Sequence, residues 1–328
     1  IDYQLQLLKM AGVDAVSVNI HGTGADEQWK TEVIKIVYAP RLKKYGIKAF
    51  ARIDSSTLSG YTEENLDELI TMFGDSVLKI DARPVISVFV NPEDRDFITK
   101  EWKSAYTEKY GTEPFVMCWG ESVTSKLADY DGVYNWTGTS SSFDGYTTTD
   151  DYEKYYDVEA AKSGYVYSAQ NIKNVLTDAK NSGASLDYIA DGVAPGFDNR
   201  PVMGWGGTNS ITRVERGENG EVYKYRWANA VQNNFPMVML PTWDDWSEGT
   251  QLMPSLKYGN LNLLITRHYA AEYKNAAENT DADFKIADWI YKIRKTTDDT
   301  SVLVDMEFAS DYLAEGDYAA AAAIVRPY

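Results

Sequence analysis

The first twenty residues, "IDYQLQLLKMAGVDAVSVNI" (1–20), decide the fold class, because a helical pattern runs directly into a strand pattern. Residues 1–12 have the apolar spacing of an amphipathic helix that closes on a glycine, and residues 13–20 form a β-branched run. Such an opening is half of a βα unit, since the strand that normally precedes the helix is absent. It predicts an eight-stranded barrel whose first strand lies upstream of residue 1.

Short β-branched runs and longer helical patterns alternate along the chain to about residue 277. The strand runs after residue 20 are 47–54, 83–90, 114–120, 131–136, 187–195 and 235–243. Helical patterns such as 26–46 and 169–183 lie between them, and this alternation predicts a parallel sheet covered by helices. A doubly wound open sheet is the alternative, but no G-x-G-x-x-G turn follows any strand run. We therefore expect an α/β fold of the (β/α)8 TIM type.

The pattern changes after residue 278. Residues 282–299 and 300–325 have the spacing of two or more amphipathic helices with a glycine turn between them. We therefore divide the chain into a barrel (1–277) and a C-terminal helical appendage (278–328). We expect the appendage either to pack on the side of the barrel or to lead to another domain.

Composition excludes several classes of partner and site. The formal net charge of -17 argues against nucleic acid and anionic polysaccharide, and it is compatible with a neutral substrate. With one cysteine, Cys118, and two histidines, His21 and His268, we expect no disulfide, metal site or cofactor. No run of about 18 apolar residues occurs, so we expect no membrane span. The 24 Tyr and 9 Trp suit sugar-stacking surfaces, although such rings also fill large cores.

Polar and aromatic residues follow most of the predicted strands, and in a parallel barrel the active site lies at the C-terminal ends of the strands. These residues are Asn19, His21, Asp54, Asn91, Glu93, Trp119, Glu121, Trp136, Asp198, Asn199, Arg200, Asp244, Asp245 and Glu248. Any one of them can be explained as a turn former or a helix cap. Their recurrence at one strand end after another favours a site.

The stretch "PTWDDWSEGTQ" (241–251) contains three carboxylates, Asp244, Asp245 and Glu248. They are either catalytic acid and base residues or only part of the acidic surface of an acidic protein. Two carboxylates beside aromatic platforms suit glycosidic bond cleavage, in which one protonates the leaving oxygen and the other activates water or attacks the anomeric centre. In a continuing strand Asp245 and Glu248 would point to opposite faces, roughly 10 Å apart. They can share a pocket only if the chain leaves the strand directly after Asp245, and Gly249 permits that turn. Asp244 would then point away.

Several stretches together resemble glycoside hydrolase families 71 and 99. Residues 1–20 and "KAFARID" (48–54) are similar to the opening of family 71, the α-1,3-glucanases, and "RPVISVFV", "PFVMCWG" and "DGVYNW" match its next strands in order. "WDDWSEG" (243–249) is similar to "WNDYGES" of family 71 and to "NEWHEGTQIE" of family 99, the endo-α-mannosidases and endo-α-mannanases. "GVAPGFDNRP" (192–201) resembles a segment of related domains from bacterial polysaccharide gene clusters. The resemblance covers residues 1 to about 255.

The resemblance implies a (β/α)8 glycosidase that acts on α-linked glycans of the α-1,3-glucan or α-mannan type. Its carboxylates carry over to Asp245 as the base and Glu248 as the acid. Family 71 implies inversion by an activated water, and family 99 implies retention with help from the 2-hydroxyl of the substrate. Asp245 matches family 71, "EGTQ" matches family 99, and Asp244 replaces the Asn of both, so the stereochemical outcome stays open.

The expected partner is a neutral oligo- or polysaccharide, bound by a monomer. The candidate sugar platforms are Trp119, Trp136, Trp205, Trp243 and Trp246. The candidate polar ligands are His21, Asp54, Asn91, Glu121, Asp198 and Asn199, whereas His268 lies in a helical pattern and is expected to be structural. The rival hypotheses are a barrel that binds or transfers sugar in surface-polysaccharide assembly, and a non-catalytic carbohydrate-binding scaffold. The sequence begins at Ile1 without Met or a signal peptide, and we interpret it as a trimmed fragment of a secreted, cell-surface or periplasmic protein.

Overall fold

The chain divides into two compact units in the computed structural model. Unit 1 comprises Ile1–Phe115 and Thr266–Tyr328, and unit 2 comprises Val116–Ile265. The structure describes residues 1–22, 25–55, 57–89, 94–120, 129–136, 158–181, 183, 186, 188–198, 201–202, 214–215 and 218–328.

Unit 1 is built on three parallel strands that pair in the order in which they occur in the chain. β1 (Ala15–Ile20) pairs with β2 (Lys48–Ile53), and β2 pairs with β4 (Arg83–Val88). The register places Asn19 opposite Arg52, and Arg52 opposite Ser87. The short β3 (Lys79–Ile80) pairs antiparallel to β4. β2 and β4 are largely buried, as expected for a parallel sheet covered by helices, whereas β1 is mostly half-buried and exposes Ser17.

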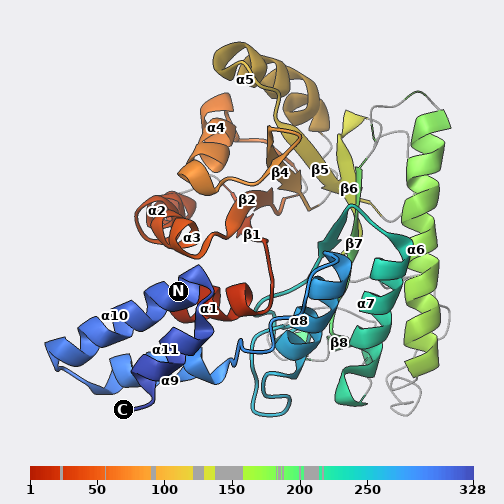
Figure 1. Ribbon diagram of the computed structural model, residues 1–328. Helices are drawn as coiled ribbons and strands as arrows, with labels where there is room; N and C mark the ends of the chain where they lie inside the picture. Colours follow the sequence, from red (N-terminus) through yellow and green to blue (C-terminus); the bar gives the residue numbers. More distant parts are fainter. Residues whose placement is uncertain are drawn as a thin grey trace. The chain divides into compact units, whose positions relative to one another are not determined.

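One helix precedes the first strand of unit 1, and others follow its strands (Figure 1). They are α1 (Asp2–Met10), α2 (Ala25–Val33), α3 (Ala39–Tyr45), α4 (Glu63–Thr71) and α5 (Trp102–Tyr110). A π-helical segment, Ile34–Tyr38, joins α2 to α3, and another, Phe97–Glu101, leads into α5. α4 starts at a capping box, in which Thr62 and Asn65 each bond the backbone of the other.

A buried carboxylate ties α4 to α5. Asp67 of α4 accepts hydrogen bonds from Trp102 Nε1 (3.0 Å), Lys109 Nζ (2.6 Å) and the Tyr110 hydroxyl (3.1 Å). The Trp102 ring is fully buried, so its indole N–H has to find its partner inside the protein. Asp67 therefore serves the packing of these two helices.

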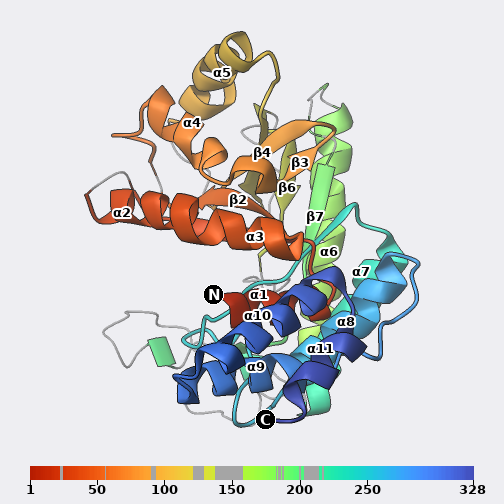
Figure 2. The same cartoon turned by 60° about the vertical axis from the view of Figure 1, so that its left-hand side comes forward.

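The C-terminal helices pack against α1 and α3 (Figure 2). They are α9 (Lys285–Thr296), α10 (Thr300–Glu315) and α11 (Tyr318–Val325). Gln6 of α1 is buried and donates to the hydroxyls of Tyr45 (3.1 Å) and Ser310 (3.1 Å), which connects α1, α3 and α10.

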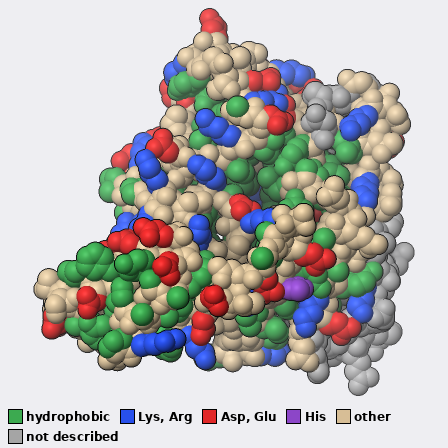
Figure 3. Space-filling view, viewed as in Figure 1, with side chains coloured by type: hydrophobic (Ala, Val, Ile, Leu, Met, Phe, Trp, Pro, Cys, Tyr) green, Lys and Arg blue, Asp and Glu red, His purple; other side chains and the backbone are tan. Residues whose placement is uncertain are grey.

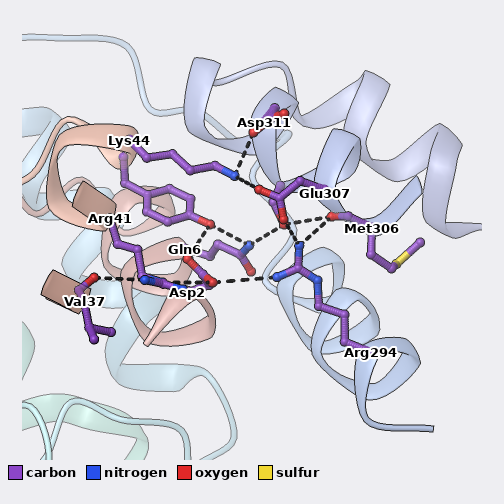
Figure 4. A network of polar contacts seen from close by, with 11 residues as sticks. Asp2, Gln6, Val37, Arg41, Lys44, Arg294, Met306, Glu307 and Asp311 are labelled. Atoms are coloured by element: carbon purple, nitrogen blue, oxygen red, sulfur yellow. Dashed lines mark hydrogen bonds and ion pairs between the residues drawn. The ribbon is translucent and has the colours of Figure 1, made fainter. Parts of the chain in front are cut away.

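Ion pairs extend this junction (Figure 4). Asp2 lies between Arg41 of α3 (3.4 Å) and Arg294 of α9 (3.7 Å), and Glu307 of α10 accepts from Arg294 (2.6 Å) and Lys44 (2.5 Å). Apolar side chains are also exposed on α10, beside the face that carries Glu307 (Figure 3). These exposed residues are Leu303, Val304, Phe308 and Tyr312.

Unit 2 continues the pattern of parallel strands paired in chain order. β5 (Phe115–Trp119) pairs with β6 (Gly132–Tyr134), β6 with β7 (Tyr188–Gly192), and β7 with β10 (Met237–Met239). Its helices are α6 (Val158–Asn181) and α7 (Glu221–Asn233), which lie side by side (Figure 1), and the first part of α8 (Leu261–Tyr273). A small antiparallel pair is formed by β8 (Phe197–Asp198) and β9 (Val214–Glu215).

The seven strand runs predicted from the sequence are all parallel strands in the structure. In both units neighbouring strands follow one another along the chain, whereas a doubly wound sheet reverses its order at a switch point. The prediction of a (β/α)8 TIM-type fold is therefore confirmed, while the strand placed before residue 1 and the domain boundary at 277/278 stay predictions.

Candidate active site

The loop that follows β10 carries the predicted carboxylate pair and is closed at its base. Thr242 N donates to Thr250 O (3.0 Å), Leu252 N donates to Thr242 O (2.9 Å), and the hydroxyls of Thr242 and Thr250 lie 2.8 Å apart. Residues 243–249 are thus presented by a short, hydrogen-bonded ring of backbone directly after a barrel strand. This is the strand end at which a barrel places its active site.

The chain turns immediately after Asp245, which is the condition under which Asp245 and Glu248 could share a pocket, and β10 itself already ends at Met239. Asp245 Oδ1 accepts hydrogen bonds from Ser247 N (3.0 Å), Glu248 N (3.0 Å) and the Ser247 hydroxyl, and Asp245 N donates to Thr242 Oγ1 (3.0 Å). Gly249 has a φ of 65°, in the left-handed region that glycine adopts without strain. Asp245 and Glu248 are both half-buried, and Asp244 is exposed.

One carboxylate oxygen of Asp245 therefore orients the turn, and the other stays available. Within the described part of the chain, Oδ2 of Asp245 accepts no hydrogen bond. A carboxylate held through one oxygen by three donors has a defined direction for its second oxygen. Glu248 is held to the same turn through its backbone.

Asp198 lies beside Glu248 in unit 2. Asp198 N donates to Glu248 O (2.6 Å), and Asp198 itself is held in the β8–β9 pair opposite Val214. The structure thus brings three of the predicted site residues together, from segments about fifty residues apart in the sequence. Six of the residues singled out in the sequence lie outside the described residues, namely Asn91, Glu93, Glu121, Asn199, Arg200 and Trp205.

Two tryptophans lie in the loop, Trp243 before the pair and Trp246 between its two carboxylates, and others occur at further strand ends of unit 2. Trp246 is 47% exposed, and Trp243 is half-buried with an indole N–H that has no hydrogen-bond partner in the part of the chain that the structure describes. Trp119 closes β5 and Trp136 follows β6, both half-buried. An indole ring that is neither fully buried nor fully exposed can present one face to a ligand.

His21 and Asp54 lie together in unit 1, at the ends of β1 and β2. His21 Nδ1 lies 3.7 Å from Asp54 Oδ2, which also accepts from Asn19 Nδ2 (3.2 Å). Asn19 Oδ1 accepts from Arg52 Nε (2.6 Å), and the Arg52 guanidinium lies 5.0 Å from the Phe89 ring centroid. Arg52 was not singled out in the sequence, although an arginine inside the strand run "KAFARID" is the kind of signal that marks a buried, partnered charge.

A second group that the sequence analysis missed is fully buried in unit 2. Asp191 of β7 accepts from Asn135 Nδ2 (2.9 Å) and from the Tyr165 hydroxyl, and Arg226 donates to Ala194 O (3.0 Å) nearby. Burial raises the pKa of the Asp191 carboxyl to about 6, although its hydrogen bonds from Tyr165 and Asn135 and the charge of Arg226 oppose the rise. The signal in the sequence is an aspartate inside the apolar run "DYIADGVAP".

Two further observations concern metals and membranes. Among the described residues, no group of three or more His, Cys, Asp or Glu is arranged to hold a metal ion. Within the same residues, none of the helices combines the length and the apolar character that a membrane crossing requires.

Two solved structures share the fold of this chain. An endo-α-mannosidase of glycoside hydrolase family 99 from Bacteroides thetaiotaomicron, in complex with bis-tris-propane, matches with a TM-score of 0.58 and 16% identity, over 84% of this chain and 83% of that one. A second structure of the family 99 endo-α-mannosidase from Bacteroides thetaiotaomicron matches with a TM-score of 0.56 and 15% identity, over 84% of this chain and 79% of that one. At this level of identity the likeness establishes the fold.

Comparison with curated proteins found no match. A family model does match: residues 56–266, more than half of the chain, fit the model described as glycosyltransferase WbsX. This segment contains the loop with Asp245 and Glu248 and most of the strand ends described above. The chain belongs to the WbsX family.

Proposed function

We propose that this protein is a glycoside hydrolase that cleaves α-linked glycans, with Asp245 and Glu248 as its catalytic carboxylates. The observation that carries the proposal is the turn after β10, in which Asp245 accepts the backbone N–H of Glu248. The fold that the chain shares with two structures of a family 99 endo-α-mannosidase supports the choice of an α-linked substrate.

In this mechanism Glu248 protonates the departing glycosidic oxygen and Asp245 acts as the base. Because Oδ1 of Asp245 holds the turn, Oδ2 is the oxygen that removes a proton from the nucleophile. The nucleophile is either a water, which gives inversion, or the 2-hydroxyl of the substrate, which closes a 1,2-anhydro sugar that a water then opens at C1 with overall retention. The tryptophans of the loop, Trp243 and Trp246, stack on the sugar rings, and Asp198 binds hydroxyl groups beside Glu248.

The test compares three isosteric variants of the loop. Asp245→Asn keeps an oxygen that can accept the hydrogen bonds of the turn, and Glu248→Gln keeps the volume of the side chain, so both variants should fold. Each should lower kcat on the cleaved glycan by several orders of magnitude, about 10³-fold or more. Asp244→Asn is the matched control, because Asp244 is exposed in the same loop and should be dispensable.

The substrates to screen are α-1,3-glucan and α-mannan, with the anomeric form of the first product followed by NMR. Inversion supports a direct attack of water, and retention supports participation of the 2-hydroxyl. Near-normal activity of Asp245→Asn or Glu248→Gln, at unchanged thermal stability, would overturn the proposed roles.

A second function, sugar transfer in surface-polysaccharide assembly, is favoured by the description of the family as a glycosyltransferase. The two functions differ in the acceptor of the glycosyl group, which is water in one case and a sugar hydroxyl in the other. Incubating the protein with an α-glycan and an excess of acceptor oligosaccharide distinguishes them by product mass. Transfer products that exceed the hydrolysis products would favour the second function.

The remaining expectations follow from the hydrolase proposal. Residues 1–277 form the catalytic barrel, and residues 278–328 form a helical appendage that packs on α1 and α3. The protein is a monomer that works outside the cytoplasm, as a secreted, cell-surface or periplasmic enzyme. It acts on a neutral glycan, in keeping with its net charge of -17.

A further inference from the structure

A carboxylate that no predicted role uses lies at the end of β7. Asp191 is fully buried, and so are Asn135, Tyr165 and Arg226 around it. Burying a carboxylate without hydrogen-bond partners costs free energy. The partners of Asp191 therefore indicate its structural role. Asp191 receives one bond from the end of β6, through Asn135, and one from α6, through Tyr165.

The Asn135 side chain both donates to and accepts from β7. Asn135 Nδ2 donates to Asp191 Oδ1 (2.9 Å), and Asn135 Oδ1 accepts from the backbone N–H of Gly192, the next residue of β7. Both functional groups of the amide are therefore used on two consecutive residues of one strand. This fixes the orientation of the amide and locks the end of β6 to the end of β7.

The residue after Asn135 is Trp136, one of the candidate sugar platforms. Its backbone carbonyl lies so close to Gly192 that a Cβ there would overlap Trp136 O and lie 2.6 Å from Asn135 O. Only glycine fits at this position of β7, because the backbone of β6 occupies the space. Contacts with Asp191 and Gly192 thus fix the path of the chain directly after β6. This path determines the backbone position of Trp136.

The polar, titratable and charged groups around Asp191 come from three segments besides its own strand. Tyr165 of α6 donates to it, Arg226 of α7 acts on it through its charge, and Asn135 follows β6. As an ionised group Asp191 accepts from both donors, whereas a protonated carboxyl has a proton of its own to donate, so protonation changes its hydrogen bonding with these partners. The pKa of about 6 places this change within a range that is easy to reach experimentally.

We propose that Asp191 is a positioning residue, which orders Asn135 and thereby holds the Trp136 platform in place for the glycan. Asp191 itself touches no substrate, since it is fully buried. The role in glycan binding rests on the proposed function, whereas the control of Trp136 by Asp191 does not.

The direct test uses 19F NMR of the full chain labelled with 5-fluorotryptophan, in which Trp136→Phe identifies the resonance of Trp136. Asp191→Asn should shift or broaden that resonance, and Tyr165→Phe, which removes a single donor, should shift it less. Asp67→Asn is the matched control, because Asp67 is a buried carboxylate with three donors in unit 1, and it should leave the Trp136 resonance unchanged. In the wild-type chain the resonance should also move as the pH passes through about 6, and this movement should be absent in Asp191→Asn.

Kinetics on the cleaved α-glycan give the second readout. Asp191→Asn should raise KM by about tenfold, the loss expected when an aromatic stack is misplaced, while kcat changes by less than about twofold. A Trp136 resonance that is identical in wild type and Asp191→Asn at every pH overturns the proposal. If the resonance shifts but the wild-type chain cleaves no α-glycan, the positioning role stands and the hydrolase proposal fails.

Discussion

The pH dependence of stability should report directly on the buried Asp191. Its pKa is raised from 3.8 to about 6, chiefly by burial, so the folded chain holds this proton more tightly than the unfolded chain does. One pKa unit corresponds to about 1.4 kcal/mol, and the rise therefore corresponds to about 3 kcal/mol. This stabilisation is fully present below about pH 4 and is lost as the pH rises to about 6 and above.

The perturbation is Asp191→Asn, which removes the ionisable group and keeps its size. Urea unfolding of both proteins, followed by far-UV circular dichroism at about pH 4, 5, 6 and 7, gives the difference in free energy of unfolding at each pH. The free energy of unfolding of the wild type should exceed that of the variant most at the acidic end, because the buried carboxyl of Asp191 is then neutral. The excess should shrink by about 3 kcal/mol by pH 7, where the wild-type chain carries a buried charge.

The difference between the two proteins isolates Asp191 from the other carboxylates, which titrate in both. A difference that stays constant across the pH range would refute the reasoning, because it would mean that Asp191 has the same pKa in the folded and unfolded chains. A difference that grows with pH would contradict it more strongly, since it would show that the folded chain favours the ionised form.

Three further predictions concern packing and the candidate site. Gly192→Ala should lower the free energy of unfolding by about 3 kcal/mol, because the new Cβ meets the backbone carbonyl of Trp136, whereas Gly22→Ala, with nothing within 4 Å, should have no measurable effect in the same urea titration. Asp67→Ala should cost about 3 kcal/mol, since it leaves a buried indole N–H without its acceptor, and a smaller loss than about 1 kcal/mol would show that water replaces the carboxylate. Trp246→Ala should raise KM on the cleaved glycan by about tenfold without changing Tm, and an unchanged KM would exclude this ring as a platform.

Local patterns in the sequence were sufficient for the barrel strands. Runs such as "RPVISVFV" are buried on both faces and are distinctive because both faces must be apolar. The first run is less buried, with Ser17 exposed, and there the β-branched pattern carried the prediction. The short β3 and the β8–β9 pair were not predicted. They contain two residues per strand, too few for any periodicity to appear.

The turn after Asp245 could also be predicted, because the requirement is local: two residues three apart and a glycine next to the second. Asp191 could not be assigned in the same way. Its partners are Asn135 and Tyr165, 56 and 26 positions away, and only the pairing of β6 with β7 and the packing of α6 bring them to it. A single aspartate in an apolar strand run indicates a buried charge, but it does not say which residues satisfy it.

The most direct test of the account is the rate of α-glycan hydrolysis by Asp245→Asn, Glu248→Gln and Asp244→Asn, measured side by side at equal folded concentration. The account predicts losses of about 10³-fold or more for the first two variants and an essentially unchanged rate for the third. Equal activity of all three variants would contradict it, because the carboxylates of the loop would then have no catalytic role.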